Sequence, residues 1–147
     1  MDDTVRRLGN PSFHVSALVA RWRAATQTFT WVNCGHAPPY LADPSGNLTE
    51  LDSPPHPALG ASEPGQQFAA TQRELHSDER IILVTDGITG RRMEGGGRFG
   101  ADGIAEAIAG LAHPTAAATA MAVLQAVTDC WREPLEDDGT VAVLAIE

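Results

Sequence analysis

Ile81-Ile82-Leu83-Val84-Thr85-Asp86-Gly87 is the stretch of the chain that decides its fold. Consecutive apolar residues that end in turn residues are typical of a central strand buried on both faces. The pair Asp86-Gly87 has turn chemistry and ends the strand abruptly. We therefore expect a sheet built around residues 81–84, with a carboxylate at the end of its central strand.

The residues before this strand predict further strands joined by turns. Residues 16–34 carry alternating apolar and polar residues on both sides of a turn at residues 24–27, which is typical of a hairpin. A second hairpin is expected over residues 39–51, around the turn Asp43-Pro44-Ser45-Gly46-Asn47. Residues 66–75 predict a weaker strand.

The residues after the central strand follow helical spacing. Ile104, Ile108 and Leu111 predict one helix, and Pro114 marks the start of a second helix. The apolar stripe predicted for this second helix consists of Ala117, Met121, Leu124, Thr128 and Trp131.

A last strand is expected at residues 140–146, after an acidic loop. Strands followed by two helices and a final strand predict the α+β class, in which largely antiparallel β-sheets are sandwiched with helices. We expect a single domain over residues 1–147, because a chain of this length can bury a core of its own. Residues 1–12 are expected to be poorly ordered.

The composition excludes several classes of protein. The chain has 10 basic and 19 acidic residues and a formal net charge of −9, which argues against a nucleic-acid-binding surface. No apolar run approaches the roughly 18 residues of a membrane-spanning helix, so we expect no membrane interaction. The first residues have no apolar stretch after their charges and do not predict a signal peptide.

Cys34 and Cys130 are the only cysteines of the chain. They are too few for a disulfide framework and lack the spacing of a metal site. Neither has an activating neighbour in sequence, so we expect both to be inert packing residues. Together with the missing signal peptide, this cysteine usage predicts a cytoplasmic protein.

Acidic residues stand at the ends of two predicted strands. Asp86 closes the central strand, and Asp137 and Asp138 precede the last one. If these strands are antiparallel neighbours, their carboxylates converge at one edge of the sheet, where Mg²⁺ or Mn²⁺ would relieve the repulsion. Each acid also has a plainer interpretation, because Asp-Gly is a common turn and an acidic pair before a strand is commonly a solvated loop.

Two other groups of residues keep two interpretations each. His36 can act as a general acid or can simply order its loop. Arg91, Arg92 and Arg98 can bind a phosphoryl group, or can stay solvated in a glycine-rich loop.

Three motifs in order resemble the landmarks of the PPM-type protein phosphatases. They are Asn33-Cys34-Gly35-His36-Ala37-Pro38-Pro39, Leu83-Val84-Thr85-Asp86-Gly87-Ile88-Thr89 and Asp137-Asp138-Gly139-Thr140-Val141. The chain most resembles the bacterial SpoIIE-like serine/threonine phosphatases, which act in sigma-factor regulation. The resemblance runs from about Phe13 to the end of the sequence.

This resemblance implies two antiparallel sheets between helix pairs, with a dinuclear Mn²⁺ or Mg²⁺ centre at one end. Asp86 and Asp137 match metal ligands of the family, and Gly87, Asp138 and His36 are secondary candidates. The implied reaction is the hydrolysis of phosphoserine or phosphothreonine by a metal-bridging water. The implied substrate is a phosphorylated regulatory protein of the anti-anti-sigma type.

One motif of the family has no counterpart in these residues. It is a Gly-Asp followed by further glycines, whose Asp bridges both metals, and residues 1–11 lack those glycines. Gly90 also stands where members often carry Glu. The chain therefore resembles the C-terminal half of a phosphatase domain. Two functions stay open: a metal-dependent phosphatase, and a non-catalytic module that binds a partner or dimerises.

A partial sheet sandwich would leave apolar surface uncovered. We expect the strands that carry Leu18, Trp22, Phe29 and Trp31 to be exposed. Because apolar patches and unpaired strand edges promote association, the sequence predicts a homo-oligomer formed through this N-terminal sheet.

Overall fold

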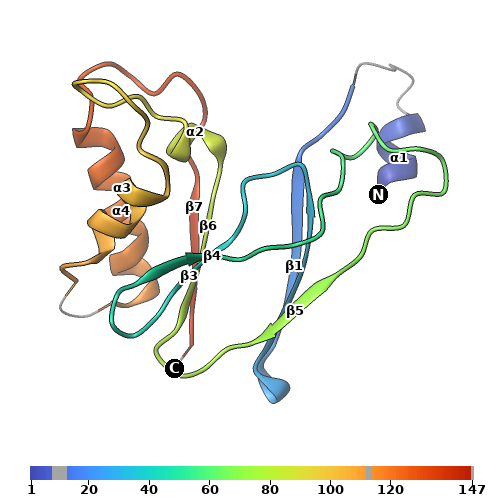
Figure 1. Cartoon of the computed structure of the whole chain (residues 1–147), viewed down its shortest axis with the longest axis horizontal. Helices are drawn as coiled ribbons and strands as arrows, with labels where there is room; N and C mark the ends of the chain where they lie inside the picture. Colours follow the sequence, from blue (N-terminus) through green and yellow to red (C-terminus); the bar gives the residue numbers. More distant parts are fainter. Residues whose placement is uncertain (8–12, 112–113, 147) are drawn as a thin grey trace. The chain divides into compact units, whose positions relative to one another are not determined.

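The computed structural model describes residues 1–7, 13–111 and 114–146. This part of the chain forms two compact units (Figure 1). Unit 1 comprises Met1–Pro38 and Asp52–Leu75, and unit 2 comprises Pro39–Leu51 and His76–Glu147. Both contain an antiparallel sheet, and together with the helices they confirm the predicted α+β class.

Unit 1 contains a three-stranded antiparallel sheet in the order β1-β2-β5. The predicted hairpin is confirmed, and its turn is the 3₁₀ helix η1 (Ala24–Thr26) followed by Gln27 in the left-handed conformation, with φ of 45°. The predicted weak strand forms only over its second half. The strands are β1 (Ala17–Arg23), β2 (Thr28–Cys34) and β5 (Thr71–Glu74).

The N-terminal residues of unit 1 form a short helix, α1 (Asp2–Arg7). The sequence predicted poor order over residues 1–12. Residues 2–7 are helical in the structure and residues 8–12 lie outside the described residues, so poor order over residues 1–12 stays a prediction. The helix is held by Asp2, whose carboxylate accepts hydrogen bonds from Arg6, from the backbone N–H of Gly60 and from the hydroxyl of Ser62.

The large side chains of the unit 1 hairpin are more buried than the sequence suggested. Phe29 and Trp31 are each 3% exposed and stack on one another with ring centroids 5.4 Å apart. Leu18 and Trp22 are half-buried. The prediction of exposed strands is therefore wrong for Phe29 and Trp31. Val19 on the edge strand β1, which the prediction did not name, is 45% exposed.

Unit 2 contains a four-stranded antiparallel sheet in the order β4-β3-β6-β7. The predicted central strand is β6 (Arg80–Val84), which pairs with β3 on one side and β7 on the other. Its residues Ile81 and Ile82 point to opposite faces, and both are fully buried. The other strands are β3 (Tyr40–Ala42), β4 (Leu48–Glu50) and β7 (Val141–Ala145).

Two helices cover one face of this sheet, as Figure 1 shows. They are α3 (Gly100–Ile108) and α4 (Ala116–Asp129), and a shorter helix, α2 (Asp86–Thr89), follows directly on β6. The core between the helices and the sheet consists of Tyr40, Ala42, Ile82, Val84, Ile88, Phe99, Ile104, Ile108, Val123 and Val127.

The buried stripe of α4 differs from the predicted one. Thr119, Val123 and Val127 face the core, whereas Met121 is 64% exposed. The physical reason is a polar contact, because the hydroxyl of Thr119 accepts a hydrogen bond of 2.8 Å from the buried guanidinium of Arg80. The predicted residues Ala117 and Thr128 are also exposed, and Leu124 and Trp131 are only half-buried.

No helix within the described ranges is both long enough and apolar enough to cross a membrane.

Candidate functional site

The pairing of β6 with β7 brings the two predicted acidic positions together. Val84, at the end of β6, is the antiparallel partner of Val141, at the start of β7. Asp86 therefore follows one strand at the point where Asp137 precedes its neighbour, as the sequence predicted for antiparallel neighbours. Both residues line one pocket of about 370 Å³.

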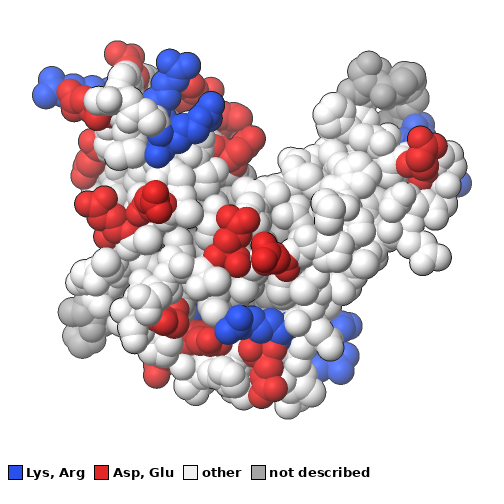
Figure 2. Space-filling view, in the orientation of Figure 1, with Lys and Arg blue, Asp and Glu red and all other residues white. Residues whose placement is uncertain are grey.

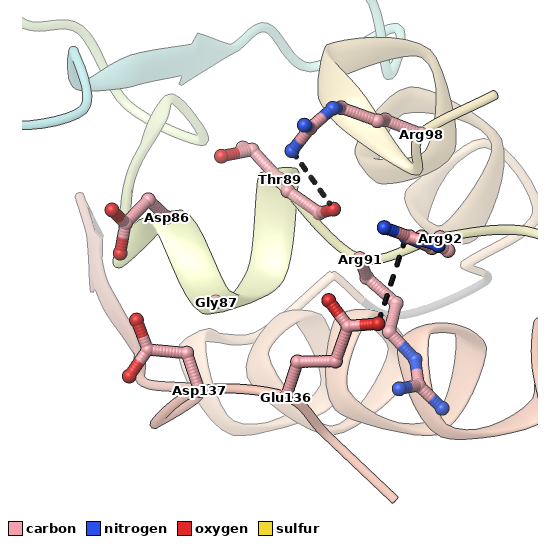
Figure 3. Close-up of a pocket in the computed structure, with 9 residues that line it drawn as sticks. Asp86, Gly87, Thr89, Arg91, Arg92, Arg98, Glu136 and Asp137 are labelled. Carbon is pink, nitrogen blue, oxygen red and sulfur yellow. Dashed lines mark hydrogen bonds and ion pairs between the residues drawn. The ribbon is translucent and has the colours of Figure 1, made fainter. Parts of the chain in front are cut away.

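The pocket has an acidic side and a basic side. In Figure 3 the carboxylates of Asp86 and Asp137 point into the same space beside Gly87, while Arg92 and Arg98 lie at the opposite end of α2. Figure 2 shows basic groups gathered at this end of unit 2, next to acidic ones. The lining residues are Asp86, Gly87, Thr89, Gly90, Arg91, Arg92, Arg98, Glu136 and Asp137.

Thr85 joins the two acidic segments. Its hydroxyl donates a hydrogen bond of 2.8 Å to the carbonyl of Asp138 and accepts one of 2.9 Å from the backbone N–H of Thr140. Its own backbone N–H donates to the carbonyl of Thr140 at 3.1 Å. The segment that carries Asp137 is thus fixed to the residue directly before Asp86.

Gly87 permits the close approach of the two segments. A Cβ atom at this position would lie 2.5 Å from the carbonyl oxygen of Asp138 and 3.2 Å from that of Asp137. Both contacts are with backbone, which cannot swing aside as a side chain can. Among the secondary candidates Gly87 therefore has a steric role, because any larger residue would push Asp86 and Asp137 apart.

The arginines of the pocket divide into one buried residue and two exposed ones. Arg91 is 6% exposed, and its guanidinium donates to the carbonyls of Trp131, Glu133 and Pro134. Its side chain is thus bonded to the backbone and not left free for a phosphoryl group. Arg92 and Arg98 are exposed. Arg92 forms an ion pair with Glu136 at 3.6 Å, and Arg98 donates a hydrogen bond of 3.2 Å to the carbonyl of Gly90.

The other secondary candidates do not line the pocket. Asp138 is exposed, and its backbone N–H donates a hydrogen bond of 2.8 Å to Oδ1 of Asp137. His36 belongs to unit 1, where its backbone N–H donates to Oδ1 of Asn33 and its carbonyl accepts from Nδ2 of the same residue. These bonds favour the interpretation in which His36 orders its loop.

Two contributors to the site were missed from the sequence. Glu136 lines the pocket beside Asp137, and Thr85 ties the acidic segments together. The adjacency of Glu136 to Asp137 was a signal that could have indicated the first. No sequence signal indicated the second, because the bonds of Thr85 depend on the pairing of two strands far apart in the chain.

The donor set of the pocket fits one hard cation. Mg²⁺ is commonly held by one or two carboxylates and keeps several water ligands, and Asp86 and Asp137 supply two carboxylates on one side of the pocket. Residues 1–7, 13–111 and 114–146 contain no group of three or more His, Cys, Asp or Glu side chains placed to hold a metal. A second ion would need further ligands.

The two cysteines play no part in this pocket. Cys34 is 2% exposed in unit 1, and burial raises the pKa of its thiol, which disfavours the reactive thiolate. Cys130 is half-buried, and its Sγ donates to the carbonyl of Val127 at 3.2 Å. Both observations agree with the predicted packing role.

One family model matches the chain. Residues 1–147 match the model of the family described as Stage II sporulation protein E (SpoIIE). No curated protein matches the chain in the corresponding sequence comparison.

Several solved structures share the fold at low sequence identity. The SiaA-PP2C domain of Pseudomonas aeruginosa has a TM-score of 0.79 and 17% identity, over 99% of this chain and 57% of that chain. The Mn-presoaked phosphatase domain of the cell fate determinant SpoIIE from Bacillus subtilis has a TM-score of 0.70 and 14% identity, over 90% of this chain and 56% of that one. The Mycobacterium tuberculosis serine/threonine phosphatase PstP/Ppp has a TM-score of 0.71 and 16% identity, over 99% of this chain and 68% of that chain.

The chain thus spans little more than half the length of the first two of these structures. At sequence identities of 14–17%, the similarity to these structures establishes the fold of the chain and nothing more.

Proposed function

The chain belongs to the SpoIIE family, and from this premise we propose that it is a metal-dependent protein phosphatase module. Its reaction is the dephosphorylation of phosphoserine or phosphothreonine on a regulatory protein in a bacterial sigma-factor-type pathway, within the cytoplasm. The observation that carries the proposal is the convergence of Asp86 and Asp137 in one pocket, at the adjoining ends of β6 and β7.

Asp86 and Asp137 are the proposed ligands of Mn²⁺ or Mg²⁺. Carboxylate oxygens are the ligands that these hard cations prefer. Manganese is supported by the Mn-presoaked phosphatase domain of Bacillus subtilis SpoIIE, which shares the fold. Asp138 is a secondary ligand candidate, because it lies next to Asp137 and is exposed.

A bound ion at this position would generate a nucleophilic water and polarise the phosphoryl group. In this reaction the residues that line the pocket have different roles. Asp86 and Asp137 hold the ion, and Gly87 lets their segments approach. The exposed guanidinium groups of Arg92 and Arg98, on the opposite side of the pocket, are placed to bind phosphoryl oxygens.

Hydrolysis of 4-nitrophenyl phosphate with Mn²⁺ and with EDTA tests the proposed reaction. We expect a rate near background, because two-metal chemistry needs two ions about 3.5–4 Å apart and the pocket holds ligands for one. A small excess of the rate with Mn²⁺ over the rate in EDTA should remain in wild type and disappear in Asp86→Asn and Asp137→Asn. It should persist in Glu106→Gln, because Glu106 is an exposed acid on α3.

An Mn²⁺-dependent excess that Asp86→Asn leaves unchanged would contradict the assignment of the site. Fast turnover that is lost in Asp137→Asn would show that another acid or a partner chain completes a dinuclear centre.

The alternative function is a non-catalytic module that binds a partner or dimerises. The observation that favours it is the small donor set, since the described residues offer no cluster of three or more metal-ligating side chains. Complete absence of Mn²⁺-dependent hydrolysis, together with retained binding of a phosphoserine peptide, would support this alternative.

A further inference from the structure

Arg91 is a buried arginine that is bonded to backbone carbonyls. It is 6% exposed, and its Nη1 donates to the carbonyl of Pro134 at 2.6 Å. Its Nη2 donates to the carbonyls of Trp131, at 3.0 Å, and of Glu133. These carbonyls belong to the loop that follows the C-terminal end of α4.

The loop that Arg91 holds leads directly to the pocket. Residues 131–134 come just before Glu136 and Asp137, which line it. On the other side of Asp137, the carbonyl of Asp138 and the backbone of Thr140 are bonded to Thr85. Asp137 therefore lies between two segments that are held by hydrogen bonds, one bonded to Arg91 and the other to Thr85.

Both anchors come from the segment that carries Asp86. Thr85 precedes Asp86, and Arg91 follows α2. A further backbone bond joins the same two segments, from the N–H of Glu94 to the carbonyl of Cys130 at 3.0 Å. The position of Asp137 relative to Asp86 is thus fixed from both sides, by contacts that include no metal.

We propose that Arg91 is a positioning residue of the metal site. By holding the carbonyls of Trp131, Glu133 and Pro134, it keeps Asp137 facing Asp86 before any ion binds. The metal part of this inference rests on the proposed function, whereas the effect of Arg91 on Asp137 does not. The chemistry that Arg91 prepares for is the binding of a divalent cation such as Mn²⁺.

The chemistry of the guanidinium explains why arginine stands here. A planar guanidinium offers five N–H donors in a fixed arrangement, which suits acceptors from three different residues. A lysine ammonium is a compact point charge and cannot reproduce that arrangement. Burial of the charge is costly, and Nε has no hydrogen-bond partner among the described residues. An apolar residue would fill the space without that cost but would not hold the loop.

The Mn²⁺ affinities of two arginine variants test the proposal. We expect Arg91→Lys to bind Mn²⁺ at least about tenfold more weakly than wild type, the usual effect of removing a group that orients a ligand. Arg132→Lys changes an exposed arginine of the same loop that does not line the pocket; it is the matched control and should bind as wild type does.

An insertion variant separates positioning from folding. Two glycines inserted between the exposed residues Pro134 and Leu135 leave the contacts of Arg91 in place but disconnect them from Asp137. This insertion should reproduce the loss of Mn²⁺ affinity, with the circular dichroism spectrum unchanged. If Arg91→Lys fails to fold, the Mn²⁺ affinity of the insertion variant decides whether the loop that Arg91 holds positions Asp137.

Amide NMR in EDTA tests the inference without metal. Arg91→Lys should shift the amide resonances of Asp137 and Asp138 and speed their hydrogen exchange, while the amide of Thr140, which is bonded to Thr85, stays protected. If wild type bound no Mn²⁺ through these acids, the proposed function would fall and this measurement would still decide the role of Arg91. Unchanged Asp137 and Asp138 amides in both Arg91→Lys and the insertion variant would overturn the inference.

Discussion

Gly87 shows how a single residue sets the distance between the two acids. Its missing side chain leaves room for the carbonyl of Asp138, which a Cβ atom would approach to 2.5 Å. The sequence indicated a turn at Asp86-Gly87, but it could not indicate this contact, because the other partner lies beyond two helices in the chain. Turn chemistry is a local property, whereas the steric need for glycine arises only in the fold.

Replacement of Gly87 by alanine should destabilise the protein by about 1–3 kcal/mol, the usual cost of overpacking a site whose neighbours cannot move aside. It should also weaken Mn²⁺ binding, because Asp86 and Asp137 are pushed apart. Urea unfolding measures the first effect and calorimetry the second. Gly110→Ala is the control, since a Cβ atom there meets nothing within 4 Å. Equal stabilities for the two variants would contradict the steric role of Gly87.

Asp2 makes the stability of unit 1 dependent on pH. The backbone N–H of Gly60, the hydroxyl of Ser62 and the guanidinium of Arg6 lower the pKa of its carboxyl from 3.8 to about 2. Because the pKa is lower in the folded state, ionised Asp2 stabilises the fold fully above about pH 4, and this stabilisation is lost as the pH falls through 2.

Asp2→Asn should therefore melt at a lower temperature than wild type at pH 5, and the difference should vanish toward pH 2. Thermal unfolding of both proteins between pH 5 and pH 2 measures it. A difference that stays constant over this range would show that the contacts of Asp2 with Gly60, Ser62 and Arg6 do not depend on its charge.

At the scale of elements, the strands were the most predictable part of the fold. The hairpins and the central strand follow from alternation, turn residues and the apolar run at residues 81–84. The stripe of α4 was predicted wrongly, because many of its residues are alanine and its core face includes Thr119. A hydroxyl that accepts a hydrogen bond from buried Arg80 is invisible to a hydrophobic pattern.

The edge strand β1 carries a prediction about association. In the described sheet of unit 1 it pairs with β2 on one side only, and Val19 is 45% exposed on it. We expect β1 to associate with a second copy by edge pairing, because an unpaired strand edge is a template for another strand. Light scattering at low micromolar concentration should give a mass above the 15.5 kDa of one chain.

Val19→Lys should reduce this mass, since a charged side chain on an edge strand opposes pairing. Met121→Lys, which places the same charge on an exposed site of α4, should leave the mass unchanged. A wild-type protein that scatters as a single chain would contradict the prediction.

At the scale of the whole molecule, the sequence predicted that Asp86 and Asp137 converge, but it did not predict the contacts that hold their segments together. The antiparallel pairing of β6 with β7 was anticipated, and it brings Asp86 and Asp137 to one pocket. The anchors that hold them, Thr85 and Arg91, bond to backbone atoms far away in the chain. Backbone carbonyls carry no sequence signal, so these contacts could be found only in the fold.

Calorimetric titration of the chain with Mn²⁺ tests the central claim most directly. Wild type should bind the ion weakly and below full occupancy, because the described residues place no group of three or more metal-ligating side chains together. Asp86→Asn and Asp137→Asn should each remove this binding, while Glu106→Gln should keep it. Tight binding that neither Asp86→Asn nor Asp137→Asn weakens would contradict the account.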